Sequence, residues 1–149
     1  MEITERLVMP CGPADVYDHI HDLERYPAWM RLVHAATPVV DPLDRPAWTV
    51  ELRARVGPFA RSKRLRMVRS EAVPDQIVAF ERAELDGRVH ARWALRAELE
   101  PTSGGSELTM RLSYGGSLWT GGLLDRVLEE EVKRGSAALI SVVRAGTTR

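Results

Sequence analysis

Glu131 is the residue whose position best suits acid–base chemistry. It flanks the apolar stripe of a long segment with helical periodicity near the end of the sequence. Burial at that position would raise the pKa of its carboxyl group and let it exchange a proton near neutral pH. A carboxylate at the edge of an apolar stripe is more often solvated, however. Glu131 is therefore a catalytic candidate with a structural alternative.

The other side chains that commonly do chemistry lack suitable spacing. The four histidines are His19, His21, His34 and His90. None is spaced from another as metal ligands are, and residues two positions apart do not share a helix face. Cys11 is the only cysteine, and no serine lies in a nucleophile elbow. The glycine pairs match no nucleotide-binding motif. We therefore predict no metal ion, no cofactor and no covalent catalysis.

One stretch of the sequence carries a conspicuous run of positive charge. Its members are Arg61, Lys63, Arg64, Arg66 and Arg69. Such a run could bind a phosphate, a carrier-protein helix or an acidic lipid headgroup. It is more often the solvated face of a sheet, here offset by nearby glutamates. If Leu65 and Met67 face inward, Arg66 faces outward, and a slip of one residue would reverse this.

Large aromatic and sulfur-containing side chains could line an apolar ligand site. The candidates of this kind are Trp29, Trp48, Met67, Trp93, Met110, Tyr114 and Trp119. Leu128 and Gly135, on the apolar stripe of the last helix, are added to them. The glycines around Trp119 would let its loop act as a lid. The alternative for each side chain is an ordinary core position.

The elements that must position these residues follow from hydrophobic periodicity. A strand over 2–9 is followed by a helix from Pro13 and a second short helix over 22–26, which Pro27 ends. Alternating patterns predict strands over 48–56, 60–73, 76–85, 89–99 and 108–114, with a tight hairpin at Asp86-Gly87. The segment from Leu123 to about Ala145 has a helical stripe and would extend for about 34 Å. A helix of that length can cross a whole sheet.

Composition narrows the function classes. The 149 residues are 44% hydrophobic, with 21 basic and 21 acidic side chains and a formal net charge of zero. A zero balance gives no field to attract nucleic acid. No apolar run approaches the roughly 18 residues needed to span a bilayer, and no signal peptide is recognisable. We expect one domain over residues 1–149, in the cytoplasm, without nucleic acid or an integral membrane segment.

Several local motifs, in this order, resemble one known superfamily. They are Gly12-Pro13-Ala14-Asp15-Val16-Tyr17, Asp22-Leu23-Glu24-Arg25-Tyr26-Pro27-Ala28-Trp29, Val56-Gly57-Pro58-Phe59 and the terminal helix. The chain is similar to the START-like, or SRPBCC, superfamily, in its polyketide cyclase/dehydrase branch. The resemblance implies an α+β helix-grip fold: a seven-stranded curved antiparallel sheet wrapped around a long C-terminal helix, with two short helices after the first strand and an internal cavity.

The resemblance also bears on activity. Aromatase/cyclases of this branch use a Tyr, a Ser and an Arg at positions that align with Val33, Ser70 and Ala72, so only the serine is kept. Without the phenol and guanidinium groups, cyclisation is poorly supported. We expect a carrier that binds a polyketide, quinone or lipid-like molecule. The alternatives are a polyketide cyclase or dehydratase that uses Ser70, Arg66 and Glu131, with an acyl carrier protein as a further candidate partner, and an interaction module that docks through the basic strand.

Overall fold

The computed structural model describes residues 2–115 and 123–147. Its elements are β1 (Glu2–Met9), α1 (Pro13–Ile20), the 3-10 helix η1 (Leu23–Ala28), β2 (Val33–Val39), β3 (Ala47–Val56), β4 (Phe59–Val73), β5 (Ile77–Arg82), β6 (Trp93–Thr102), β7 (Gly105–Tyr114) and α2 (Leu123–Thr147). The order that the resemblance implies, one strand, two short helices, six strands and a long helix, is confirmed. β2 was not among the strands that periodicity predicted. All seven strands join one antiparallel sheet in the order β1-β7-β6-β5-β4-β3-β2.

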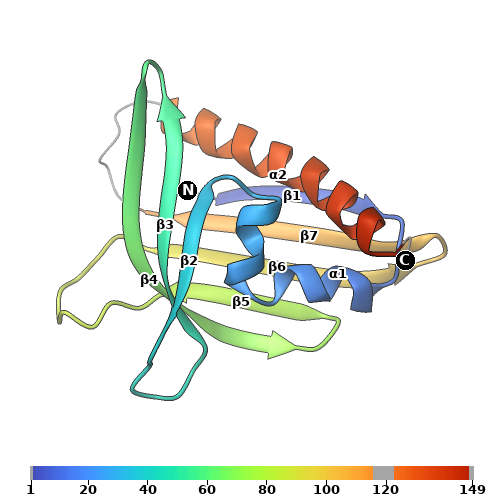
Figure 1. Ribbon diagram of the computed structural model, residues 1–149, viewed down its shortest axis with the longest axis horizontal. Coiled ribbons are helices and arrows are strands. Elements are labelled where there is room, and N and C mark those ends of the chain that lie inside the picture. Colours follow the sequence, from blue (N-terminus) through green and yellow to red (C-terminus); the bar gives the residue numbers. More distant parts are fainter. Residues whose placement is uncertain (1, 116–122, 148–149) are drawn as a thin grey trace.

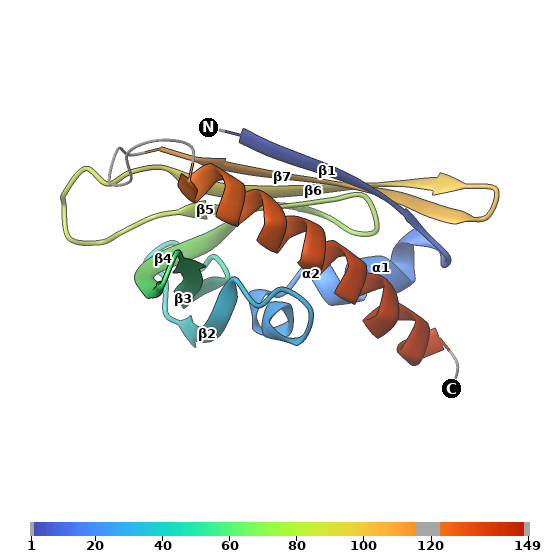
Figure 2. The same cartoon turned by 90° about the horizontal axis from the view of Figure 1, so that it is seen from above.

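The sheet bends around the C-terminal helix. Figure 1 shows α2 running across the sheet, and Figure 2 shows that β2, β3 and β4 turn away from the plane of the other strands. α2 lies against β1 and β3, while α1 packs against β6, β7 and α2. Strand β7 alternates as expected for one buried face, since every second residue from Ser106 to Tyr114 is buried. The hollow face therefore carries the apolar side chains.

The apolar stripe of α2 has the predicted helical spacing. Leu128, Val132, Gly135, Leu139 and Val143 are buried, at steps of three and four residues. Gly135 allows a close approach to the segment after η1. A Cβ atom there would lie 3.3 Å from the carbonyl oxygen of Trp29 and 3.4 Å from the Cα atom of Met30. A side chain at position 135 would therefore force this backbone to move by a few tenths of an ångström.

The structure differs from the sequence analysis between β5 and β6. The prediction of a tight hairpin at Asp86-Gly87 is wrong. β5 and β6 are paired, but residues 83–92 form a longer connection between them. Local side-chain bonds replace the ladder there: Asp86 accepts from the backbone N–H of Arg88 and contacts His90, while Arg82 donates to the carbonyl oxygen of Ala91. The second short element likewise continues through Pro27 as a 3-10 helix.

Gly135→Leu should destabilise the fold by about 1–3 kcal/mol, because the added side chain must displace backbone atoms of the Trp29–Met30 segment. Urea denaturation monitored by circular dichroism would measure the free energy of unfolding. Ala137→Leu, on the exposed face of the same helix, is the matched control and should be nearly neutral. Equal stability of the two variants would contradict the close-approach account.

Candidate ligand-binding cavity

An apolar cavity of about 50 Å³ lies between the sheet and α2. Strands β2, β3, β4, β6 and β7 form its floor, η1 and the following segment form one wall, and α2 adds one side chain. The lining residues are Leu23, Met30, Leu32, Val33, Val50, Leu52, Leu65, Met67, Trp93, Ala94, Leu95, Met110, Leu112 and Val132. Within the described ranges, this lining contains no charged side chain. Trp93 is its only residue with a polar side-chain group, and the Nε1 atom of that group is buried rather than open to the cavity.

The cavity is small but has adaptable walls. Pockets for drug-sized ligands usually enclose about 300–1,000 Å³, so a ligand larger than a few heavy atoms must displace side chains here. Met30, Met67 and Met110 lie on three different parts of the wall. Unbranched thioether side chains change conformation at low cost and make favourable contacts with aromatic ligands. The cavity can therefore widen without breaking the sheet.

An ion pair spans the cavity wall between α2 and the segment after η1. Both Nε and Nη2 of Arg31 donate to the Glu131 carboxylate, at 2.8–3.2 Å. Met30 and Leu32 line the cavity on either side of Arg31 in sequence, and Val132 does so next to Glu131. The Arg31 side chain is 64% exposed and that of Glu131 is 10% exposed, so solvent weakens the pair to about 1 kcal/mol or less. This ion pair therefore holds α2 weakly to the segment after η1.

Trp93 and Lys63 form a mixed aromatic and cationic group beside the cavity. The Trp93 ring stacks on Tyr114 with centroids 5.5 Å apart. The Nζ atom of Lys63 lies 5.9 Å from the centre of the Trp93 ring, a cation–π geometry. Partial burial, reinforced by the charge of Arg82, lowers the pKa of the Lys63 ammonium group, while Glu84 opposes this effect. The ammonium group thus lies in a partly dehydrated position.

Three of the predicted ligand-binding residues line the cavity: Met67, Trp93 and Met110. Tyr114 lies behind Trp93, and Leu128 is buried in the core outside the lining. Gly135 contacts the Trp29–Met30 backbone instead. Trp119 lies outside the described residues.

The other two predicted tryptophans are buried away from the cavity lining. Trp29 packs on Tyr26 and its indole N–H donates to the carbonyl oxygen of His19 at 3.3 Å. Trp48 packs on Phe80 and donates to the carboxylate of Glu24 at 3.2 Å. Both indole N–H groups are thus bonded within the protein.

The three catalytic candidates occupy separate places, and none is among the lining residues. Ser70 is exposed, and its hydroxyl group donates to the carbonyl oxygen of Ala79 at 3.4 Å. Glu131 is paired with Arg31. Leu65 and Met67 line the cavity, so Arg66 lies on the opposite face of β4, and the register shifts only beyond it, between Arg69 and Glu71. The orientation that the pattern left open is thereby settled.

Arg66 is buried by an ionic cluster that the sequence analysis missed. It donates to the Asp41 carboxylate at 2.8 Å and to the carbonyl oxygens of Val40 and Ala83. Arg45 also pairs with Asp41, at 2.9 Å. The hydrogen bonds from Arg45 and then Arg66 hold the pKa of Asp41 well below its usual range, against the opposing effect of burial. The cluster joins the β2–β3 connection to the β5–β6 connection. In the sequence, only the acidic Asp41, followed by Pro42 and with Arg45 four residues later, could have indicated it.

The cavity lining itself was partly visible in the sequence. Val50 and Leu52 stand on the apolar side of the alternation in β3, and Leu112 stands on that of β7. Met30 and Leu32 could not be identified in this way, because they follow η1 in a segment without periodicity.

Neither a metal cluster nor a membrane span is found in the described part of the chain. Residues 2–115 and 123–147 contain no group of three or more potential metal-ligating side chains. No helix in these ranges is both long and apolar enough to cross a bilayer.

A long helix across the hollow face of a seven-stranded antiparallel sheet, with two short helices after the first strand, defines the helix-grip, START-like fold. Residues 1–144 match the model of the family described as polyketide cyclase/dehydrase and lipid transport. The chain therefore belongs to this family. No curated protein matches it significantly in sequence.

Solved structures show the same fold at low sequence identity. A protein of Thermus thermophilus, TTHA0849, has a TM-score of 0.77 at 19% identity and covers 98% of this chain and 99% of its own. A START superfamily protein from Mycobacterium smegmatis has a TM-score of 0.73 at 14% identity, with 97% of each chain covered. The di-domain aromatase/cyclase StfQ of the steffimycin biosynthetic pathway has a TM-score of 0.65 at 15% identity, over 97% of this chain and 51% of its own.

Asp41→Asn should lower the stability of the fold at neutral pH, because it removes the charge that Arg45 and Arg66 bind. The pKa of Asp41 is lowered on folding, so its contribution is complete above the unfolded value of about 4 and is lost as the pH falls below it. The difference in thermal midpoint between wild type and variant should therefore narrow progressively below pH ~4.

Asp44→Asn in the same connection is the control, because Asp44 is exposed and takes part in neither ion pair. A difference in thermal midpoint between wild type and Asp41→Asn that stays constant from pH 7 down to pH ~2 would contradict a stabilising role of the Asp41 charge.

Proposed function

We propose that this protein binds a hydrophobic small molecule, such as a lipid, a quinone or a polyketide, between the sheet and α2, and carries it without transforming it. Membership of a family described by polyketide cyclisation and lipid transport supports a hydrophobic ligand. The observation that carries the proposal is the cavity wall: the described lining side chains are apolar and come from both the sheet and α2. Such a wall favours desolvation of an apolar ligand.

The distribution of charge supports carriage over catalysis. Cyclisation or dehydration of a poly-β-ketone needs groups that move protons or stabilise an enolate at the reacting carbons. In the described portion of the lining, the Trp93 indole N–H is the only such polar group. Ser70, Arg66 and Glu131 all bond to other protein groups outside the lining.

A polyketide cyclase or dehydratase is the second candidate function. Glu131 favours it, because this carboxylate is buried one residue from the cavity-lining Val132. The outer face of the projecting β3–β4 hairpin (Figure 1) offers a surface for an acidic acyl carrier protein, since Arg53, Arg55 and Arg64 lie on the face opposite the cavity-lining Leu52 and Leu65. In this mechanism, Arg31 would release Glu131 when substrate binds.

Val132→Phe should weaken ligand binding about tenfold or more, because the larger side chain fills the cavity. The probe is N-phenyl-1-naphthylamine, whose fluorescence rises in an apolar site, and displacement by fatty acids, quinones and aromatic polyketides would rank ligands. Val8→Phe, on an exposed position of β1, is the matched control and should keep wild-type affinity. Equal affinities of all three proteins would contradict binding in this cavity.

Incubation with a poly-β-ketone mimic should return the mimic unchanged, as measured by liquid chromatography with mass spectrometry. Conversion that is lost in Ser70→Ala or in Glu131→Gln would contradict carriage and support the enzyme. Glu130→Gln, an exposed neighbour on α2, controls for the loss of charge.

A further inference from the structure

The indole N–H of Trp93 is a buried donor without an acceptor among the residues that the structure describes. Trp93 is 8% exposed and lines the cavity. Its Nε1 atom is fully buried and has no hydrogen-bond partner within the described residues. A buried donor left unpaired costs about 1–3 kcal/mol, and most buried polar groups in native proteins are paired. This donor therefore needs an explanation.

The other described tryptophans show that the fold can supply acceptors. Trp29 donates to a backbone carbonyl oxygen and Trp48 donates to a carboxylate. Neither of these two side chains lines the cavity. The unpaired indole is thus the one whose surroundings are the candidate ligand site.

A water molecule is a poor partner for this group. A stable buried water needs two to four polar partners. The described lining side chains provide one, the Trp93 donor itself, and the rest are hydrocarbon or thioether groups. An oxygen atom that belongs to a largely apolar molecule avoids this difficulty, because the remainder of the molecule fills the apolar space.

The charge of the acceptor follows from the same lining. A carboxylate in the cavity would need a cation at the accepting oxygen, and the described lining side chains contain none. Lys63, the cation beside the cavity, lies over the face of the Trp93 ring, 5.9 Å from its centre, whereas the indole N–H points out along the ring plane. A cation in that position draws electron density from the ring and makes the indole N–H a stronger donor toward a neutral oxygen.

We propose that the ligand is a neutral, largely apolar molecule with a carbonyl oxygen that accepts a hydrogen bond from the Trp93 indole N–H. The inference rests on the proposed function and names the chemical class of its ligand. Carbonyl-bearing molecules should thus be preferred over hydrocarbons of the same shape. The preference should be about three- to tenfold in Kd, as expected for one hydrogen bond.

The test uses a matched pair of probes, 2-acetonaphthone and 2-isopropenylnaphthalene, which differ in C=O against C=CH₂. With protein labelled with nitrogen-15 at tryptophan, each indole N–H gives its own resonance, and Trp93→Phe assigns that of Trp93. We expect 2-acetonaphthone to bind more tightly and to shift the Trp93 indole proton downfield, whereas 2-isopropenylnaphthalene should not. The Trp29 and Trp48 indoles, already bonded within the protein, are internal controls.

In Trp93→Phe, which keeps an aromatic wall without the donor, the two probes should bind equally. Equal binding to the wild-type protein, or the same movement of the Trp93 resonance with both probes, would overturn this inference and leave the proposed function standing. Failure of both probes to bind would overturn the proposed function and the inference together. If the variant does not fold, the comparison of probes on the wild-type protein still decides.

Discussion

One helix is too narrow to cover the hollow side of this sheet. Seven strands at about 4.8 Å spacing span about 29 Å, whereas a helix with its side chains is about 10 Å across. α1 and η1 cover part of the remaining width, and Trp29, Tyr26 and Phe80 fill part of the interior. What is left between α2, the segment after η1 and strands β3, β4, β6 and β7 is the apolar cavity. The site is therefore a consequence of how the layers meet.

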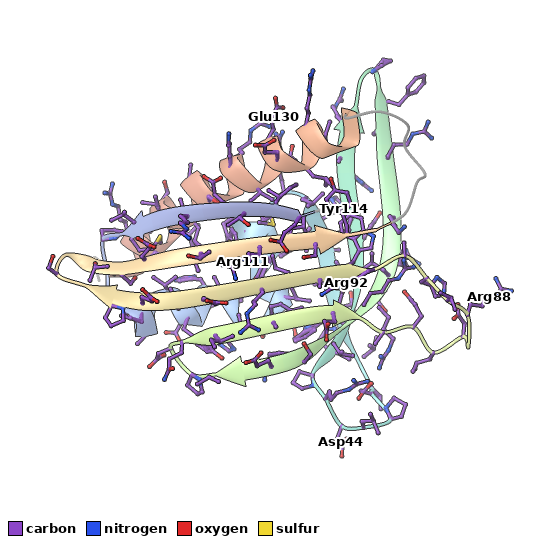
Figure 3. The ribbon with its side chains drawn as sticks, turned by 180° about the vertical axis from the view of Figure 1, so that it is seen from behind. Asp44, Arg88, Arg92, Arg111, Tyr114 and Glu130 are labelled. Atoms are coloured by element: carbon purple, nitrogen blue, oxygen red, sulfur yellow. The ribbon has the colours of Figure 1, made fainter. Side chains whose placement is uncertain are left out.

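The charged side chains lie where they do not disturb that interior. On the outer face of the sheet, Arg96 pairs with Glu71 and Glu98, and Arg111 also reaches Glu98. Figure 3 shows this face, with Arg111 on it and with Asp44 and Arg88 on two projecting connections. On this outer face, Arg66 of β4 bonds to Asp41 in the first connection and to the carbonyl oxygen of Ala83 in the second, and so links the two. These ion pairs hold Arg66, Arg96 and Arg111 on the face of the sheet opposite the cavity.

Sequence periodicity was sufficient where a single buried face decides the structure. The alternation in β3 and β7 and the three- and four-residue steps in α2 predicted which residues point inward. Trp93 and Met110 stood on clear apolar faces of two late strands, whereas the pattern left the face of Met67 open. It failed where side chains bond to a nearby backbone, as between Asp86 and Arg88. It also could not show that Trp29 and Trp48 bond to acceptors while Trp93 has none among the described residues. The acceptors of Trp29 and Trp48 lie 10 and 24 residues away in sequence.

The central claim is that α2 and the curved sheet enclose an apolar space that a ligand can enter. A crystal exposed to xenon gas tests it most directly, because xenon occupies dry apolar cavities and is easily located by its scattering. The account predicts a xenon atom among Met67, Met110 and Val132, in a cavity of about 50 Å³. Side chains packed solidly through this region, with no xenon between α2 and the sheet, would contradict it.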